Sequence, residues 1–465
     1  MKKLIHLAFL ATIISAGCRK IEVDGGSDSG GGKGNGTTEN TILEGRISEN
    51  RTLKADYVYK LRGLVYVTNG AVLTIEPGTK IVGEKGKNGG LVITRSCKII
   101  ADGTPEKPIV FTSEESNPQR GDWAGVVLLG NAPTNASFNG QQGIGEIEGG
   151  INNSDGLGLY GMGASSNPAD NSGILRYVRI EYAGYAFLPD KEINGLTFGG
   201  VGSGTIVDYV QVSYANDDSF EWFGGTVNCS HLISYKALDD DFDIDNGFSG
   251  KVQFGIALRD SAVADISKSE AFESDNDANG SQLLPQTTAI FSNMTVVGPR
   301  QNSNNIGNSL FLAAAQIRRN SSLSIFNSIF MGWPTGLLID ASKGYPTDNN
   351  FSKGLSVQNT IIGGCATPVS YAASTTAPTG ATSASILNWF NTMTYGNTIA
   401  STTADVRLTA PFNYINPDFS PLDASPALSG ASFSHPHLSN GFIPVTYRGA
   451  AGMNDNWYKG WTNFR

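Results

Sequence analysis

Acidic residues recur near the middle of the chain in three short copies of one pattern. The densest stretch, DDDFDIDNGF (239–248), places five aspartates within seven positions. The order acid, any residue, Phe, acid occurs in DSFEWFGG (218–225), DDFDIDNG (240–247) and EAFESDND (270–277). The matching acids are Asp218 and Glu221, Asp240 and Asp243, Glu270 and Glu273, followed by Asp245 and Asp275. Carboxylates at this density repel one another, so they require raised pKa values, basic partners or a bound cation.

These acids form columns if the three copies occupy successive coils of a β-structure. When the phenylalanine of each copy faces the interior, the residue that follows it faces outward. Neighbouring strands lie about 4.8 Å apart, so we expect Glu221, Asp243 and Glu273 in one outer column. Two negative charges about 5 Å apart cost roughly 3 kcal/mol at an effective dielectric constant near 20. The predicted column therefore needs compensation.

Calcium is one form of compensation, because it accepts six to eight oxygen ligands in flexible geometry. We predict a Ca²⁺ site whose candidate ligands are Asp218, Glu221, Asp240, Asp243, Asp245, Glu270, Glu273 and Asp275. The stretch is not an EF-hand, since Gly247 falls one place late and position twelve is Val252. Two explanations without a metal stay open: the acids are simply solvated, or they discourage edge pairing of an extended β surface.

The same acidic face could bind or process a polymer. Glycoside hydrolysis uses two carboxylates whose pKa values are separated, whereas a calcium-dependent lyase also needs a basic residue that accepts a proton. Arg259, Lys268 and Arg300 lie near the acidic copies in the sequence. We predict that Arg259 and Lys268 contact the polymer, and no residue is assigned a catalytic role.

The rest of the chain predicts the scaffold that positions these acids. Short runs rich in Val, Ile, Tyr and Phe alternate with Gly, Asn, Asp, Ser and Pro, and long helical periodicity is absent. Related segments recur in YVRIEYAGYAF, YVQVSYANDDSF and SHLISYKALDDDF, which align Tyr182, Tyr214 and Tyr235. Steps of 21 to 34 residues between related segments suit one turn of a solenoid. The sequence therefore predicts an all-β parallel β-helix.

A second set of related segments supports the same fold. The segments SNMTVVG, FNSIFMG and QNTIIGG place an asparagine at equivalent positions, namely Asn293, Asn327 and Asn359. Stacked asparagines can form an amide ladder. We expect one at this position of the coils.

The two ends of the chain predict an export signal and a cap. Lys2 and Lys3, an apolar stretch and SAGC before Cys18 resemble a bacterial lipoprotein signal. We predict a signal peptide over 1–17, a lipidated Cys18 with a flexible tether over 18–40, a β-helix over 41–440 and a C-terminal cap over 441–465. Trp457 and Trp461 are expected to close the end of the solenoid. The protein should then be lipid-anchored at the outer membrane, facing the periplasm or the exterior.

Charge and cysteine content argue against nucleic-acid binding, a disulfide framework and a zinc site. The net charge of −9 and the pI near 5.1 oppose binding to nucleic acid. Beyond Cys18 the cysteines are Cys97, Cys229 and Cys365, an odd number with spacings that fit neither a disulfide framework nor a zinc site. We expect a monomer with buried, free thiols.

Several longer motifs resemble a known family. They are AVLTIEPGTKIVG, GTPEKPIVFTS, GDWAGVVLLGNAPTN, GGVGSGTIVDYVQVSYANDDSFEWFGGTVN and NDNWYKGWTNF. Together they are similar to right-handed parallel β-helix lipoproteins of Bacteroidetes-type bacteria, with the architecture of the pectin-lyase-like superfamily. The resemblance implies the hand of the helix. Our leading expectation is a surface lipoprotein whose acidic face, loaded with calcium, binds glycan or another extracellular polymer. The alternatives are a calcium-dependent polysaccharide lyase or glycoside hydrolase, and a structural or adhesive protein without a small-ligand site.

Overall fold

The structure is a computed structural model that describes residues 39–188, 191–305 and 307–465. Residues Thr41–Arg465 form one compact unit, separate from Met1–Asn40. The predicted signal peptide, Cys18 and nearly all of the predicted tether lie outside the described residues. Within the described part of the chain, no helix has the length and apolar character needed to cross a membrane.

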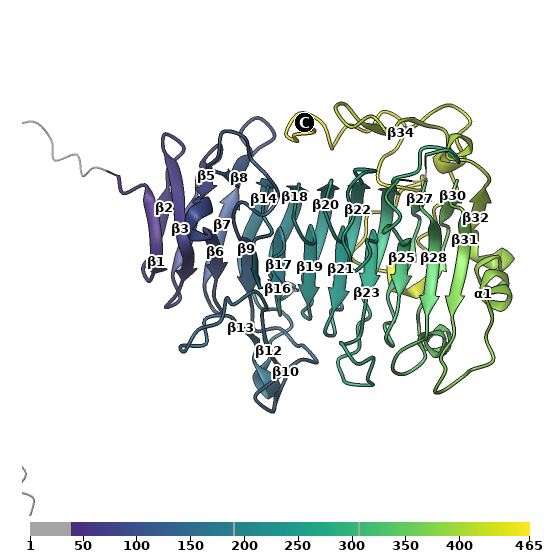
Figure 1. The fold of residues 1–465 in the computed structure, drawn as a ribbon, viewed down its shortest axis with the longest axis horizontal. Helices are drawn as coiled ribbons and strands as arrows, with labels where there is room; N and C mark the ends of the chain where they lie inside the picture. The colour runs from purple at the N-terminus through teal and green to yellow at the C-terminus, as the bar shows by residue number, and fades with distance from the viewer. Residues whose placement is uncertain (1–38, 189–190, 306) are drawn as a thin grey trace, which may run out of the picture. The chain divides into compact units, whose positions relative to one another are not determined.

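The unit is a right-handed parallel β-helix, as the sequence predicts (Figure 1). Twenty-six strands of the described residues pair into one continuous sheet that winds through successive coils. The first coils contain β1 (Ile42–Ile47), β2 (Arg51–Leu53), β3 (Val58–Val67), β4 (Val72–Ile75), β5 (Lys80–Gly83), β6 (Gly90–Ile93), β7 (Lys98–Asp102), β8 (Ile109–Ser113) and β9 (Gly125–Leu129). The middle coils contain β14 (Gly173–Glu181), β17 (Leu196–Gly199), β18 (Ile206–Ser213), β19 (Phe220–Phe223), β20 (Asn228–Tyr235), β21 (Phe242–Asp245), β22 (Lys251–Leu258), β23 (Phe272–Ser274), β24 (Ile290–Val297) and β25 (Ala313–Ile317). The last coils contain β26 (Ser324–Phe326), β27 (Ile329–Met331), β28 (Thr335–Asp340), β29 (Val357–Gln358), β30 (Ile361–Gly363), β31 (Thr367–Ala372) and β32 (Thr398–Ala400).

The core fills the inside of the coils. Inward side chains of successive strands lie in register, as in the pairs Leu196–Phe220, Phe220–Phe242 and Phe242–Phe272. The rings of Phe220 and Phe242 are 5.7 Å apart, and those of Phe242 and Phe272 are 5.3 Å apart. All are fully buried. This apolar stack fixes the register, because a slip of one residue would turn the acidic face inward.

One corner of the coil is formed by residues with a left-handed backbone. The positive-φ residues in this column are Tyr177, Tyr209, His231, Phe254, Asn293, Asn327 and Asn359. Stacking supports this unusual conformation, since the rings of Tyr177 and Tyr209 are 4.4 Å apart and those of Tyr209 and His231 are 4.2 Å apart. The predicted equivalence of the three asparagines is confirmed by the strand register. The expected amide ladder is not the arrangement found for Asn327, whose amide donates to Ser292 Oγ at 3.1 Å.

The alignment of the tyrosine segments is wrong by one residue in the third copy. Ser213 pairs with Tyr235, so Tyr214 is level with Lys236. Lys236 takes a left-handed conformation, as Tyr214 does, and its ammonium lies 5.2 Å from the centre of the Tyr214 ring. Tyr235 is buried instead, packed against Phe464.

Two segments outside the coils cover parts of the outer surface. Residues 131–165, here called the excursion, contain β10 (Ser137–Phe138), β11 (Gln141–Gln142), β12 (Ile144–Glu146) and β13 (Leu159–Gly161). A further short pair is formed by β15 (Ala186–Leu188) and β16 (Lys191–Glu192). An apolar cluster that includes Val127, Leu129, Ile147 and Tyr160 joins the excursion to the outside of β9.

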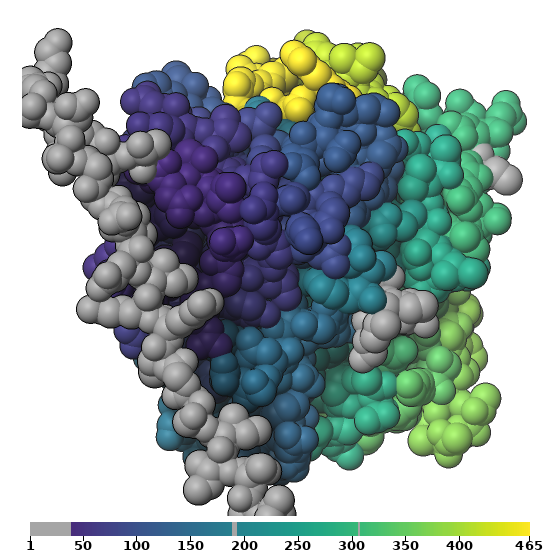
Figure 2. Space-filling view, turned by 60° about the vertical axis from the view of Figure 1, so that its left-hand side comes forward, coloured from purple at the N-terminus to yellow at the C-terminus, as the bar shows by residue number. Residues whose placement is uncertain are grey.

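The chain end returns along the outside of the coils. Residues 404–465, here called the strap, contain β33 (Leu408–Ala410) and β34 (Asp418–Pro421) and reach back to β14. In Figure 2 the yellow end of the strap lies against the blue coils of the first half of the chain. Trp457 and Trp461 pack against Tyr209, with ring centres 6.3 and 6.1 Å away. The expectation that they close the end of the solenoid is therefore wrong, and α1 (Ser383–Phe390) packs against β31 there instead.

Candidate functional site: an acidic cleft on the outer wall

The predicted outer column of carboxylates is confirmed by the register of the strands. Glu221 pairs with Asp243, Asp243 with Glu273, and Glu273 with Gln316. The neighbouring phenylalanines and Trp222 point into the coil and are fully buried, as alternation predicts. The repeat in the sequence therefore reflects the stacking of one outward-facing position over three coils.

A second row of acids lies where these strands begin. The amide of Asp240 donates to Asp218 Oδ1 at 2.8 Å, and the amide of Glu270 donates to Asp240 Oδ1 at 2.6 Å. Asn194 starts this ladder, because its side-chain oxygen accepts the amide of Asp218 at 3.2 Å. One side-chain oxygen of each acceptor thus satisfies a backbone amide of the next coil.

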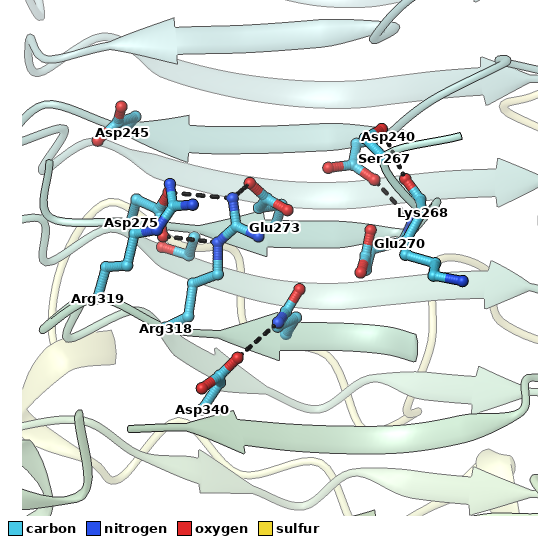
Figure 3. A network of polar contacts seen from close by, with 12 residues as sticks. Asp240, Asp245, Ser267, Lys268, Glu270, Glu273, Asp275, Arg318, Arg319 and Asp340 are labelled. Atoms are coloured by element: carbon cyan, nitrogen blue, oxygen red, sulfur yellow. Dashed lines mark hydrogen bonds and ion pairs between the residues drawn. The ribbon is translucent and has the colours of Figure 1, made fainter. Parts of the chain in front are cut away.

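A third row lies where the strands end, and arginines neutralise part of it (Figure 3). Arg318 donates to Asp275 at 2.9 Å and also contacts Glu273. Arg319 donates to Asp275 at 2.5 Å. These arginines follow β25, on the next coil. Sequence reasoning missed them because more than 40 residues separate them from the acids that they bind.

The remaining acids surround a cleft of about 410 Å³. Seven of its eleven lining residues are acidic and none is basic: Glu148, Asp217, Asp218, Glu221, Asp239, Asp243 and Asp265. Glu148 comes from the excursion, and Asp265 comes from the loop after β22. Sequence reasoning omitted Glu148, Asp217, Asp239 and Asp265 as ligands. For Asp217 and Asp239 a signal existed, since each directly precedes a predicted ligand.

Burial raises the pKa of nearly every carboxyl group in these rows. Burial and the nearby Asp265 raise the pKa of Asp239 to about 8. Burial and Asp243 raise that of Asp245 to about 8, and burial raises that of Glu270 to about 7. The pKa values of Asp218, Glu221, Asp240 and Asp275 also lie well above their usual range, chiefly through burial. Without a counter-ion, several of these groups hold protons at neutral pH.

Three groups of carboxylates have oxygens close enough to share one cation. They are Asp217 with Asp218 and Asp239, Asp218 with Glu221 and Asp243, and Asp240 with Glu270 and Glu273, each with ligand oxygens within 4.8 Å of one another. Oxygens Oδ1 of Asp239 and Oε1 of Glu270 are buried without a hydrogen-bond partner. Buried acceptors of this kind, in an all-oxygen donor set, fit calcium.

The basic residues predicted to contact a polymer occupy different environments. Arg259 is fully buried, donates to the carbonyls of Asp239 and Leu238, and pairs with Asp241 at 3.3 Å. Its predicted contact with a polymer is incompatible with this burial, so we assign it a structural role. Lys268 is exposed beside Glu270 (Figure 3). Arg300 lies outside the lining of the cleft, at Gly332.

Stacked parallel coils with an acidic cleft on one outer wall define a parallel β-helix that carries a candidate cation site. Residues 45–408 match the family described as "Pectate-lyase like beta helix domain", and the chain belongs to this family. No match to a curated protein is found. The predicted superfamily architecture is thereby confirmed, whereas the narrower lipoprotein family remains a prediction. Cys97, Cys229 and Cys365 are free; Cys97 and Cys229 are buried as expected, whereas Cys365 is only half-buried.

Proposed function

We propose that the protein binds a polysaccharide through a cation held in the acidic cleft. The observation that carries this proposal is the lining of the cleft, in which seven of eleven residues are acidic and none is basic. Such a site repels an anionic chain when empty and attracts one when a divalent cation is bound. The family supports a polysaccharide as the ligand.

The cation belongs at the half of the acidic surface that the arginines leave uncompensated. Arg318 and Arg319 pair with Glu273 and Asp275. Among the described residues, no salt bridge reaches Asp218, Glu221 or Asp243, which form one of the three candidate groups. Calcium held there would leave coordination positions open toward the cleft, where hydroxyl or carboxylate oxygens of a ligand can bind.

Calorimetry with calcium tests the cation site. Asp243→Asn removes one charge at the centre of the column and should weaken calcium binding roughly tenfold or more. The matched control is Asp423→Asn, an exposed acid on the strap, which should bind calcium like the wild type. Absence of heat and of a thermal shift with the wild type would contradict the proposal and favour a structural or adhesive protein.

Polymer binding is measured separately, with polygalacturonate and a neutral glucan as probes. We expect polygalacturonate to be retained in calcium and released in EDTA, and Asp243→Asn to lower retention. Calcium binding without retention of either polymer would refute polysaccharide binding while leaving the metal site in place.

Glycoside hydrolysis is the second candidate, and the cleft itself favours it over a lyase. Burial raises the pKa of Glu221 well above its usual range, so this group can hold a proton near the carboxylate of Asp243. A protonated acid beside a second carboxylate is the arrangement that glycosidases use. A lyase that takes the proton with an arginine or lysine needs such a residue in the cleft, and no described residue lining the cleft is basic. Release of new reducing ends without unsaturated products, lost in Glu221→Gln, would support hydrolysis; release of unsaturated products would contradict this preference.

We further propose that the protein is anchored by an acylated Cys18 at the outer membrane. The support is the sequence before Cys18 and the glycine-rich stretch after it. Labelling of cells with radioactive palmitate should mark the wild type but not Cys18→Ser. Equal labelling of both would contradict the anchor.

A further inference from the structure

A second hollow borders the acidic cleft at Glu148. The second hollow has a volume of about 440 Å³ and shares Glu148 with the cleft. The cleft is lined by residues at the beginning of the strands, such as Asp217 and Asp239, whereas the second hollow is lined by residues at their end, such as Phe223 and Asn246. The two hollows therefore lie at opposite ends of the same strands.

The candidate cation group lines the cleft and lies on the strands that lead from the cleft to the second hollow. Figure 3 shows Asp240 at one end of this part of the sheet and Asp245 at the other. From Asp239 to Asn246 the chain advances seven residues, or about 23 Å at the usual rise of a strand. Glu221 and Asp243 occupy the middle of this path. A ligand that fills both hollows must be extended.

Each hollow has an exposed apolar side chain in its lining. Ile266 lines the cleft and is 83% exposed, and Leu283 lines the second hollow and is 40% exposed. Hydrogen bonds hold the residues next to both rims in place. Ser267 Oγ donates to Asp239 at 2.9 Å, and the side-chain amide of Asn276 donates to the carbonyl of Leu283 at 3.2 Å. The rims thus hold two apolar contacts in fixed places on either side of the acids.

We infer that the ligand chain runs parallel to the strands, perpendicular to the axis of the β-helix, with Ile266 and Leu283 as the contacts that bind its two ends. Sugar rings have apolar C–H faces and polar edges, so the rings can rest on the two apolar side chains while their oxygens face the cation. The inference rests on the proposed function and adds to it. Binding should depend on chain length, because only a chain of several units reaches both rims.

The test is the affinity for oligogalacturonates of two, four and six units, measured by calorimetry in calcium. The hexamer should bind the wild type roughly tenfold more tightly than the dimer, because it buries apolar surface at both rims. Ile266→Ser and Leu283→Ser should each weaken hexamer binding roughly fivefold and leave calcium affinity unchanged. Their matched control is Ile415→Ser, which removes a similarly exposed side chain (78%) on the strap.

The outcomes separate this inference from the proposed function. Equal binding of dimer and hexamer, or hexamer binding that neither rim variant weakens, would overturn the inference alone. Failure of every oligomer to bind in calcium would overturn the proposed binding of polygalacturonate, and the inference with it. Loss of calcium affinity in a rim variant would show that the rim supports the metal site instead, which also contradicts the inference. Thermal melts of each variant confirm that it is folded.

Discussion

The carboxylates of the outer wall differ in their surroundings. Glu273 and Asp275 have arginine partners, whereas burial raises the pKa values of Asp218 and Glu221 in the cleft well above their usual range. Arg318 is largely buried among these acids, and burial lowers its own pKa. It therefore acts as a tethered counter-ion whose field also reaches Asp243.

Arg318→Gln should destabilise the protein and strengthen calcium binding. The substitution leaves Glu273 and Asp275 with less compensation in a mostly buried site, which costs about 2 kcal/mol or more. The same loss of positive charge makes the neighbouring column a better cation site. Urea unfolding in EDTA and calcium calorimetry measure the two effects. Arg319→Gln is the control, because Asp275 keeps Arg318 as a partner. Weaker calcium binding in Arg318→Gln would contradict this account.

The acidic columns could be predicted because each copy contains an inward phenylalanine. Strand alternation then indicates that the residue after this phenylalanine points outward. Arg259 could not be placed in the same way. It directly follows β22, where strand alternation no longer applies, and its guanidinium turns toward the carbonyls before β21. Glu148 and Arg318 reach the site from the excursion and from another coil, which no local pattern indicates.

Among the elements, the strap is held by a buried apolar cluster, which includes Phe419 and Trp461, and by polar side chains near the corner of the coils. Gln211 exchanges two hydrogen bonds of 2.8 Å with the backbone of Asn463, and Gln253 does the same with Ile443. Asn293 donates to the carbonyl of Tyr447 at 3.0 Å. These side chains bind backbone groups of the strap much as a neighbouring strand would, so this part of the docking does not depend on the side chains of the strap.

Gln211→Ala should detach the end of the strap while the coils stay folded. The loss of two hydrogen bonds from a fully buried side chain should cost about 1–3 kcal/mol. Hydrogen exchange at the amide of Asn463 should accelerate, whereas amides of β20 keep their protection. Gln141→Ala, on the exposed surface of the excursion, should change neither. Unchanged exchange at Asn463 would show that the aromatic contacts of Trp457 and Trp461 hold the strap without Gln211.

The sequence identified the kind of element but not the path of the chain end. Strand periodicity and turn residues predict the β-helix, because each coil repeats the same pattern of short strands and turns around one core. The strap forms only two short strands, and its tryptophans pack on residues 250 positions earlier. A contact at that separation has no local signature, so a cap was the natural but wrong expectation for Trp457 and Trp461.

At the scale of the whole molecule, nearly all of the net charge belongs to the coils that bear the site. Residues 217–277 contain 14 acidic and 4 basic residues, a net charge of −10, against −9 for the complete chain. The remainder of the protein is thus close to neutral. Stability should therefore respond to pH mainly through this one region.

The protein without a cation should become less stable as pH rises from about 5 to 8. The folded-state pKa values of Asp239 and Asp245 are about 8 and that of Glu270 is about 7, all above the values near 4 expected in the unfolded chain. Between these limits the folded state binds more protons than the unfolded state, so the free energy of unfolding falls with rising pH, by about 2 kcal/mol or more in total.

Calcium should flatten this dependence of stability on pH, because it stabilises the ionised carboxylates. Thermal melts in EDTA and in calcium at pH 5, 6, 7 and 8 measure both curves, with Asp245→Asn expected to reduce the slope in EDTA and Asp423→Asn to preserve it. A melting temperature that rises over this range in EDTA would mean that the carboxylates are already compensated in the absence of a metal.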